Sequence, residues 1–292
     1  MAAFEIRPRR ATELVDASFQ LLRRFYPPLL TVSAIAMSPG VFMRIILREQ
    51  LSNPTAMMTN LGVTFGTLAL SMFCIAIADA VLVVAASEGY LEGNVDLGRA
   101  LGAGMRRLIP VILSVLLRYL VVVVPLVVLG GVAAVLMAGV AKATSAGPTG
   151  AIVLVALLFP FLFWLMLYAG LRTFAVTPAV LIERQGPWSS ITRSWRLSKD
   201  CTWHIFFSLG LAWLLYFVIA LIATVVGAML LSPQMVGVVS AILIIPIYPL
   251  LAVVTTLLYY DLRIRKEGFD LELMSKDLGA ASAPASAPLP AA

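Results

Sequence analysis

The stretch ERQGPWSSITRSWRLSKDCTW, residues Glu183 to Trp203, is the longest polar interval between two hydrophobic blocks of this chain. It combines a Gly-Pro turn, two serines suited to capping a helix, several basic residues and tryptophans. Tryptophan favours the depth of the lipid head groups, and basic residues favour the cytoplasmic side of a membrane. The pattern predicts an elbow, meaning a short helix on the bilayer surface that leads into a transmembrane hairpin.

The composition requires an apolar solvent around most of the chain. Of 292 residues, 61% are hydrophobic and 12% are charged, and the mean hydropathy is +0.99. A soluble domain carries about 25% charged residues, so this chain cannot cover a water-facing surface. The net charge of +6 does not indicate nucleic-acid binding, because the basic residues lie between apolar blocks and no recognition motif accompanies them.

Six apolar blocks reach the length of about 20 residues that a membrane-spanning helix needs. Two of them are much longer than that and contain Pro125 and Pro160, so we expect these helices to be kinked or broken, or to project beyond the membrane. The six blocks cover residues 29–47, 61–86, 110–141, 151–182, 204–231 and 236–260.

Weaker copies of the elbow occur twice more. One begins at Thr12 and ends in two arginines, and the other begins at Asp96 and also ends in two arginines. The cap of the third elbow is Ser189 or Ser190. Together, the three elbows and the six apolar blocks predict an all-α polytopic membrane protein. Its six transmembrane helices form three tandem hairpins, each preceded by an amphipathic interfacial helix. The predicted membrane domain covers residues 1–278, with repeat-like units at 12–90, 96–186 and 189–269, and residues 279–292 form a disordered Ala/Ser/Pro tail.

Each hairpin ends in a related polar signal. The first ends in Glu88-Gly89-Tyr90, the second in Glu183 with Gly186 and Trp188, and the third in Glu267-Gly268-Phe269. We expect the glycine to end the helix and the aromatic side chain to lie at the depth of the lipid head groups.

The distribution of basic residues predicts the orientation. Sixteen lie in the elbows and terminal segments, and only Arg44, Arg48 and Lys142 lie on the opposite side. This bias places the elbows and both termini of a multi-pass membrane protein in the cytoplasm. Five elbow cations are predicted to contact anionic lipid: Arg106, Arg107, Arg193, Arg196 and Lys199.

Three charged residues lie inside the predicted spans. At 1.5 Å per residue, Asp79 lies about 13 Å and Arg118 and Arg172 each about 16 Å from the cytoplasmic ends of their helices. Such charges are costly and mark a candidate intramembrane charge cluster. One interpretation is a structural ion pair or triad. The other is a polar cavity open to the cytoplasm, in which the spare cation binds an anionic head group or solute.

The sequence contains no recognisable catalytic or metal-binding motif. Its two cysteines, Cys74 and Cys201, lie far apart, and His204 is the only histidine. Zinc sites need a cluster of cysteines and histidines, and neither a Ser-His-Asp order nor a phosphate loop is present. We therefore expect no catalytic residue, no cofactor and no metal.

Three segments carry a resemblance to a known family. RPRRATELVDASFQLLRR, PAVLIERQGPWSSITRSWRLSK and LYYDLRIRKEGFDLEL together resemble bacterial proteins of the glycerophosphoryl diester phosphodiesterase membrane-domain family. The resemblance implies a membrane domain that can precede a soluble phosphodiesterase barrel. That chemistry needs histidines and a metal held by carboxylates, so we expect a stand-alone member in which the catalytic barrel is absent.

The predicted function is therefore non-enzymatic. We expect a scaffold or partner subunit in an envelope or lipid-linked process of the bacterial inner membrane. The alternative is a transporter or lipid-handling permease that uses a charged cavity on the cytoplasmic side. The expected partners are the lipid bilayer, with anionic lipids on its cytoplasmic side, and either another membrane protein or a second copy of the chain, but not nucleic acid.

Overall fold

The protein is an all-α polytopic membrane protein, as the sequence predicts. A computed structural model describes residues 7–48, 50, 55, 60–143, 147–272 and 275. Within these residues, five helices are long and apolar enough to cross a membrane, or six if a bent pair counts as one span. The helices are α1 (Ala11–Arg24), α2 (Tyr26–Ile46), α5 (Leu61–Leu91), α6 (Leu97–Arg106), α7 (Leu108–Ala143), α8 (Gly147–Arg172), α9 (Val176–Ile182), α10 (Pro187–Ser198), α11 (Thr202–Leu230), α12 (Pro233–Ile244) and α13 (Tyr248–Glu267).

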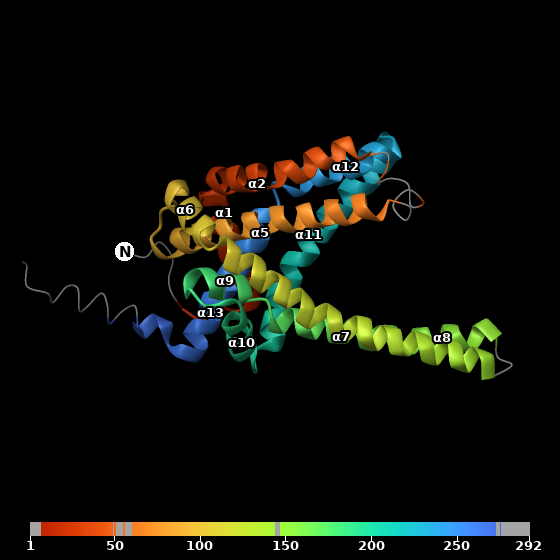
Figure 1. The fold of residues 1–292 in the computed structure, drawn as a ribbon. Coiled ribbons are helices and arrows are strands. Elements are labelled where there is room, and N and C mark those ends of the chain that lie inside the picture. The colour runs from red at the N-terminus through yellow and green to blue at the C-terminus, as the bar shows by residue number, and fades with distance from the viewer. Residues whose placement is uncertain are drawn as a thin grey trace, which may run out of the picture.

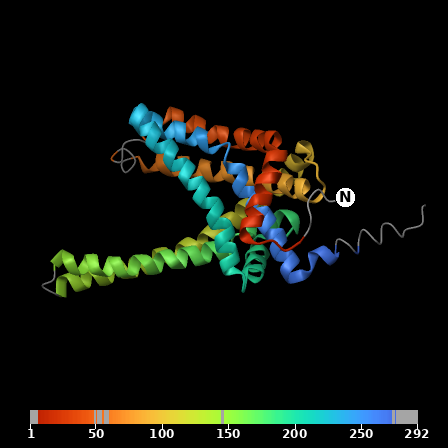
Figure 2. The same cartoon turned by 180° about the vertical axis from the view of Figure 1, so that it is seen from behind.

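The long helices pack as three hairpins in chain order. Helix α2 packs along α5, α7 along α8, and α11 against both α12 and α13. The short helices α1, α6 and α10 precede the three hairpins, and we call them the elbow helices. The α7–α8 pair runs away from the other long helices, and both views show this (Figures 1 and 2).

The elbow helices pack in the same way in all three units. Helix α6 packs on α5 and α10 packs on α9, so each elbow helix contacts the last helix of the hairpin before it. Helix α1 packs on α13, the last helix of the third hairpin, and thereby joins the end of the chain to its beginning. The three units thus close into a ring on one side of the molecule, which we call the elbow side (Figure 1).

The core lies at the elbow side, where α5, α9 and α13 meet. Tyr90, Tyr260 and Phe269 stack there in sequence, with ring centroids 5.6 Å and 5.5 Å apart. This packing buries Tyr90 and Phe269 to 3% and 7% exposure, so neither ring is presented to lipid, while their depth at the head groups stays a prediction. Exposed positions on the elbows are taken instead by Trp188 and Trp203.

One of the three predicted helix caps is confirmed. The Asp96 carboxylate accepts hydrogen bonds from the backbone N–H groups of Gly98 and Arg99, at 2.9 and 3.2 Å. The other two predictions were wrong: α1 follows Arg10 and α10 follows Gly186, and neither has a side-chain cap. In α10 the reason is Pro187, whose fixed φ sets the first helical residue two positions ahead of the serines.

The expected glycine ends are confirmed only in the third hairpin. Gly268 ends α13 in the left-handed conformation, with φ 63°. Gly89 lies inside α5, which continues to Leu91, and Gly186 precedes α10 instead of following a helix.

The fourth span is broken between α8 and α9. Pro178, the third residue of α9, has no N–H to donate to the Phe174 carbonyl, and in a continuous helix its ring would clash with that carbonyl. At the end of α8, the Arg172 carbonyl accepts the Ser194 hydroxyl of α10 at 2.8 Å, and the same hydroxyl accepts the Ala175 N–H at 3.1 Å. The third elbow helix therefore stabilises the break.

The sixth span, predicted as one segment over 236–260, is also broken, with a bend of 40° between α12 and α13. Pro249 cannot donate to the Ile245 carbonyl, which accepts the Ser33 hydroxyl of α2 at 3.0 Å instead. The Pro246 carbonyl accepts the Tyr26 hydroxyl, also of α2, at 3.4 Å. Irregular backbone inside a membrane requires such partners.

Pro125 and Pro160, in contrast, lie inside unbroken helices. The breaks therefore occur at other prolines, where side chains of a neighbouring element donate to the freed carbonyls. Helix α7 has 36 residues and α8 has 26, so both helices of the second hairpin are longer than a bilayer needs, as predicted.

Candidate functional site

Charged residues of the elbow side form a network around Glu183, which follows α9. Arg193 of α10 donates from Nε and Nη2 to the two Glu183 carboxylate oxygens, at 2.8 and 2.7 Å. It also donates to Glu267 at the end of α13, at 2.7 Å from Nη2. The Tyr259 hydroxyl donates to Glu183. One arginine of the third elbow therefore joins the ends of the second and third hairpins.

Arg263 of α13 completes this network. Its Nε lies 3.5 Å from Glu183 and 3.3 Å from Glu267, and its guanidinium lies 4.1 Å from the centre of the Phe269 ring. We call these five side chains the exit network: Glu183, Arg193, Tyr259, Arg263 and Glu267. The side chains of Arg193, Glu183 and Arg263 are only 13–14% exposed, so water screens the pairs weakly.

A similar pair occurs at the end of the first hairpin. The Glu88 carboxylate of α5 lies 3.0 Å from the Arg99 guanidinium of α6, and it accepts the Asp96 N–H at 3.3 Å. Glu88 and Glu183 occupy corresponding positions, because each lies at the end of a hairpin and each binds an arginine of the next elbow. The glutamates of the exit signals therefore fix the elbow helices in place.

The environment of Glu183 controls its ionisation. Partial burial disfavours the charged form, but the hydrogen bonds from Arg193 and Tyr259 and the nearby charges of Arg193 and Arg263 outweigh that effect. The pKa of Glu183 is therefore held below its ordinary value of 4.5. The hydrogen bonds to Glu267 and Glu183 raise the pKa of Arg193, which stays charged at any ordinary pH.

Acid should weaken the exit network. Because the folded pKa of Glu183 is lowered, the stability that it contributes is complete above pH 4.5 and is lost as the pH falls through the folded pKa. We expect the melting temperature of the detergent-solubilised protein to fall between pH 5 and pH 3 more steeply in the wild type than in Glu183→Gln, measured by thermal scanning. Equal slopes for the two proteins would contradict this assignment.

A second elbow-side cluster surrounds Asp261 of α13, whose side chain is 3% exposed. Its carboxylate accepts hydrogen bonds from Arg265 at 2.7 Å and from the backbone N–H of Arg9 at 2.7 Å. The His204 Nε2 lies 2.9 Å from Oδ2, the carboxylate oxygen that also accepts from Arg265. This cluster joins the first residues of the described chain to α11 and α13.

The five predicted lipid contacts divide into two groups. Arg193 lies inside the exit network and faces carboxylates, so it is not available to lipid. Arg107 is half-buried and donates to the Arg184 carbonyl at 3.4 Å. The side chains of Arg106, Arg196 and Lys199 are exposed, as the prediction requires.

The three predicted intramembrane charges are placed in two different surroundings. Asp79 of α5 accepts the Tyr248 hydroxyl of α13 at 2.6 Å. Arg118 of α7 interacts electrostatically with Asp79 and Tyr248, without forming an ion pair within 4 Å among the described residues. Tyr216 of α11 also lies near Tyr248. We call these four residues from four helices the Asp79 cluster.

Arg172 has separate contacts. Its Nε and Nη2 donate to the Tyr168 hydroxyl at 3.1 and 2.9 Å, and its guanidinium lies over the rings of Tyr168 and Trp195, at 5.1 and 5.5 Å. The predicted depth assumed a continuous helix up to Ile182. Because α8 ends at Arg172, the third elbow helix reaches this residue, and the three charges do not form one cluster.

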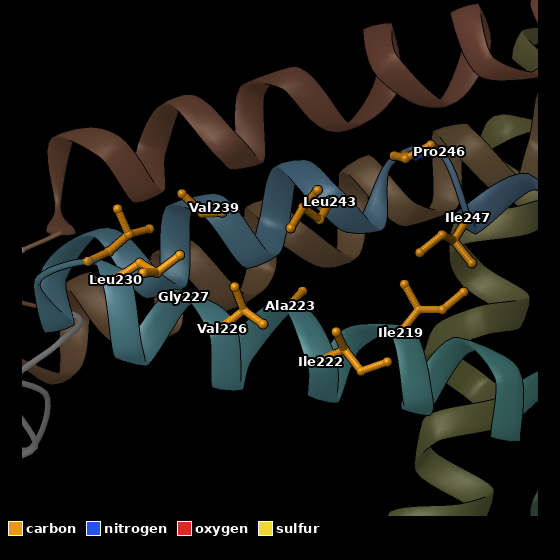
Figure 3. Close-up of a pocket in the computed structure, with 11 residues that line it drawn as sticks. Ile219, Ile222, Ala223, Val226, Gly227, Leu230, Val239, Leu243, Pro246 and Ile247 are labelled. Carbon is orange, nitrogen blue, oxygen red and sulfur yellow. The ribbon is translucent and has the colours of Figure 1, made fainter.

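An apolar groove of about 580 Å³ lies between α11 and α12 (Figure 3). Ile219 and Ile247 lie at one end of it and Leu230 lies at the other. The lining is apolar throughout, and Pro246 from the break in the sixth span forms part of it. No charged residue lines this groove, and no group of three His, Cys, Asp or Glu side chains in the described part of the chain could hold a metal ion.

Sequence reasoning missed the exit network and the tyrosines of the Asp79 cluster. The three glutamates at the hairpin ends were noticed only as turn signals, although their regular recurrence before an elbow arginine was a usable signal. The role of Tyr248 had no local signal, because its partner Asp79 lies 169 residues away.

Comparisons with known proteins identified no relative of this chain. No protein-family model, curated protein or solved structure matches this chain.

Proposed function

We propose that this protein is a non-enzymatic membrane scaffold or partner subunit in an envelope or lipid-linked process. The observation that carries the proposal is the α7–α8 hairpin, which stands apart from the other long helices (Figures 1 and 2). Helix α7 has 36 residues, which is about 54 Å of helix against about 30 Å of hydrocarbon. An apolar helix of that length needs a strong tilt or an apolar cover, and a membrane helix of a partner provides such a cover.

The placement of the charges supports the same role. Tyr248 binds Asp79, while Tyr168 and Trp195 hold Arg172. A transporter built on these charges would bring them to one cavity, whereas the groove between α11 and α12 is apolar.

The alternative of a transporter or lipid-handling permease is favoured by one observation, the break between α12 and α13. Discontinuous helices at membrane depth form the binding sites of many secondary transporters. The break lies next to Tyr248 and so adjoins the Asp79 cluster.

We further propose a bacterial inner membrane as the location, with both termini in the cytoplasm. The elbow helices, which carry many of the basic residues, lie on one side of the molecule, and the positive-inside bias places that side in the cytoplasm. We also propose that residues 12–90, 96–186 and 189–269 are internal repeats with amphipathic elbows. The recurring elbow packing and the Glu88–Arg99 and Glu183–Arg193 pairs support that relation.

Photocrosslinking in cells tests the scaffold role. A benzophenone amino acid at Val128 of α7 or at Trp164 of α8, both 56% exposed, is expected to form a protein adduct of one defined mass. The same probe at Leu214 of α11, which is 58% exposed, serves as the control and is expected to label lipid only. Lipid adducts alone at all three positions would remove the proposal, and an adduct of twice the chain mass would identify a second copy as the partner.

A further inference from the structure

The α11–α12 groove has the shape and chemistry of a site for a hydrocarbon chain. From Ile219 to Leu230 it follows about 16 Å of α11, at 1.5 Å per residue. Its volume of about 580 Å³ lies within the range of small-molecule pockets, about 300–1,000 Å³. An apolar groove offers water no hydrogen-bond partner. Because the groove lies in a membrane-spanning hairpin, the bilayer supplies a lipid chain as its occupant.

One end of the groove adjoins polar side chains. Ile219 lies one helical turn after Tyr216, on the same side of α11, and Ile247 immediately precedes Tyr248. Figure 3 shows Ile219 and Ile247 facing each other at this end. The apolar groove therefore leads to the Asp79 cluster.

The Asp79 cluster contains donors that the protein does not use. Among the described residues, no hydrogen bond involves the Arg118 guanidinium or the Tyr216 hydroxyl, while Asp79 is already bound by Tyr248. All four side chains of the cluster are partly exposed, so a ligand can reach them from the surface of the helices. A cation without a hydrogen bond at membrane depth is costly unless a ligand satisfies it.

We propose that the groove and the Asp79 cluster together bind one anionic phospholipid. Its hydrocarbon chain lies in the groove, and its phosphate accepts hydrogen bonds from Arg118 and Tyr216. The planar guanidinium suits two phosphate oxygens at once, and this distinguishes a phosphate from an uncharged head group. The site does not depend on a protein partner at the α7–α8 hairpin, so it stands independently of the scaffold role.

Native mass spectrometry of the full chain in mild detergent tests this assignment. The protein is titrated with phosphatidylglycerol and, separately, with a diacylglycerol of the same chains, which has no phosphate. We expect the wild type to bind phosphatidylglycerol more tightly. Arg118→Gln should weaken phosphatidylglycerol binding about tenfold, the loss expected for one charge-assisted hydrogen bond, and leave diacylglycerol binding unchanged. Equal weakening of both lipids, or of neither, would overturn the head-group assignment.

The groove is tested separately by Ala223→Phe, which fills it from α11 (Figure 3). This variant should lose most binding of both lipids, whereas Leu214→Phe, on the exposed side of the same helix, should bind them as the wild type does. Unchanged binding in Ala223→Phe would overturn the groove assignment. If Arg118→Gln does not fold, this pair decides the proposal, since it leaves the charge in place.

Discussion

Replacing Arg193 with alanine is expected to lower the free energy of unfolding of the protein strongly. Arg193 is the shared partner of Glu183 and Glu267, and its removal leaves two partly buried carboxylates without their main counter-charge. Loss of one partner from a buried ion pair costs about 3–5 kcal/mol, and the partial exposure here lowers the expected cost to about 2–4 kcal/mol. A thermal or denaturant unfolding curve in mild detergent measures it.

Arg196 provides a matched control on the same helix. Its side chain is exposed, so Arg196→Ala should change the stability by no more than about 0.5 kcal/mol. Arg193→Lys should restore only part of the loss, because an ammonium group lacks the planar fork that binds two carboxylates together. If the alanine variants at positions 193 and 196 unfold alike, the exit network does not hold the hairpins together.

A methyl group added at Gly104 should separate the second elbow helix from the first hairpin. A Cβ atom there would lie 2.9 Å from the backbone oxygen of Ala80 and 3.1 Å from the Val81 side chain. The oxygen belongs to the α5 backbone and cannot move without shifting the helix. We expect Gly104→Ala to lower the free energy of unfolding by about 1–3 kcal/mol, the usual cost of overpacking.

Gly102, two residues earlier in α6, separates this effect from helix propensity. A Cβ atom at Gly102 meets nothing within 4 Å, so Gly102→Ala should leave the stability unchanged or raise it by up to about 1 kcal/mol. Opposite signs for the two substitutions in unfolding curves would support the close packing of α6 on α5. A stabilising effect at both positions would show that the two helices are not in close contact.

Much of the helix architecture was predictable because it depends on local chemistry. The apolar blocks are at least about as long as the hydrocarbon core is thick, so their positions follow from hydropathy alone, and the overlong second hairpin was recognised from its length. The Asp96 cap was predictable for a similar reason, since its partners are two and three residues away.

The predicted charges show where local reasoning ends. The depth of Arg172 was calculated along one continuous helix, and the break after that residue changed its partners. Arg193 was assigned to lipid as an elbow cation, because its first partner, Glu183, had been interpreted as a turn signal. Its second partner, Glu267, lies 74 residues away.

The sequence by itself determined that the chain is a helical membrane protein, how its apolar helices follow one another, and where its basic elbows lie. Those features follow from hydrophobicity, charge and helix geometry over at most a few tens of residues. The tertiary structure decided which prolines break a span, which arginines face carboxylates and which polar groups meet at the groove. Each of these depends on a partner from another helix, because a freed carbonyl or a buried charge is stable only where such a partner reaches it.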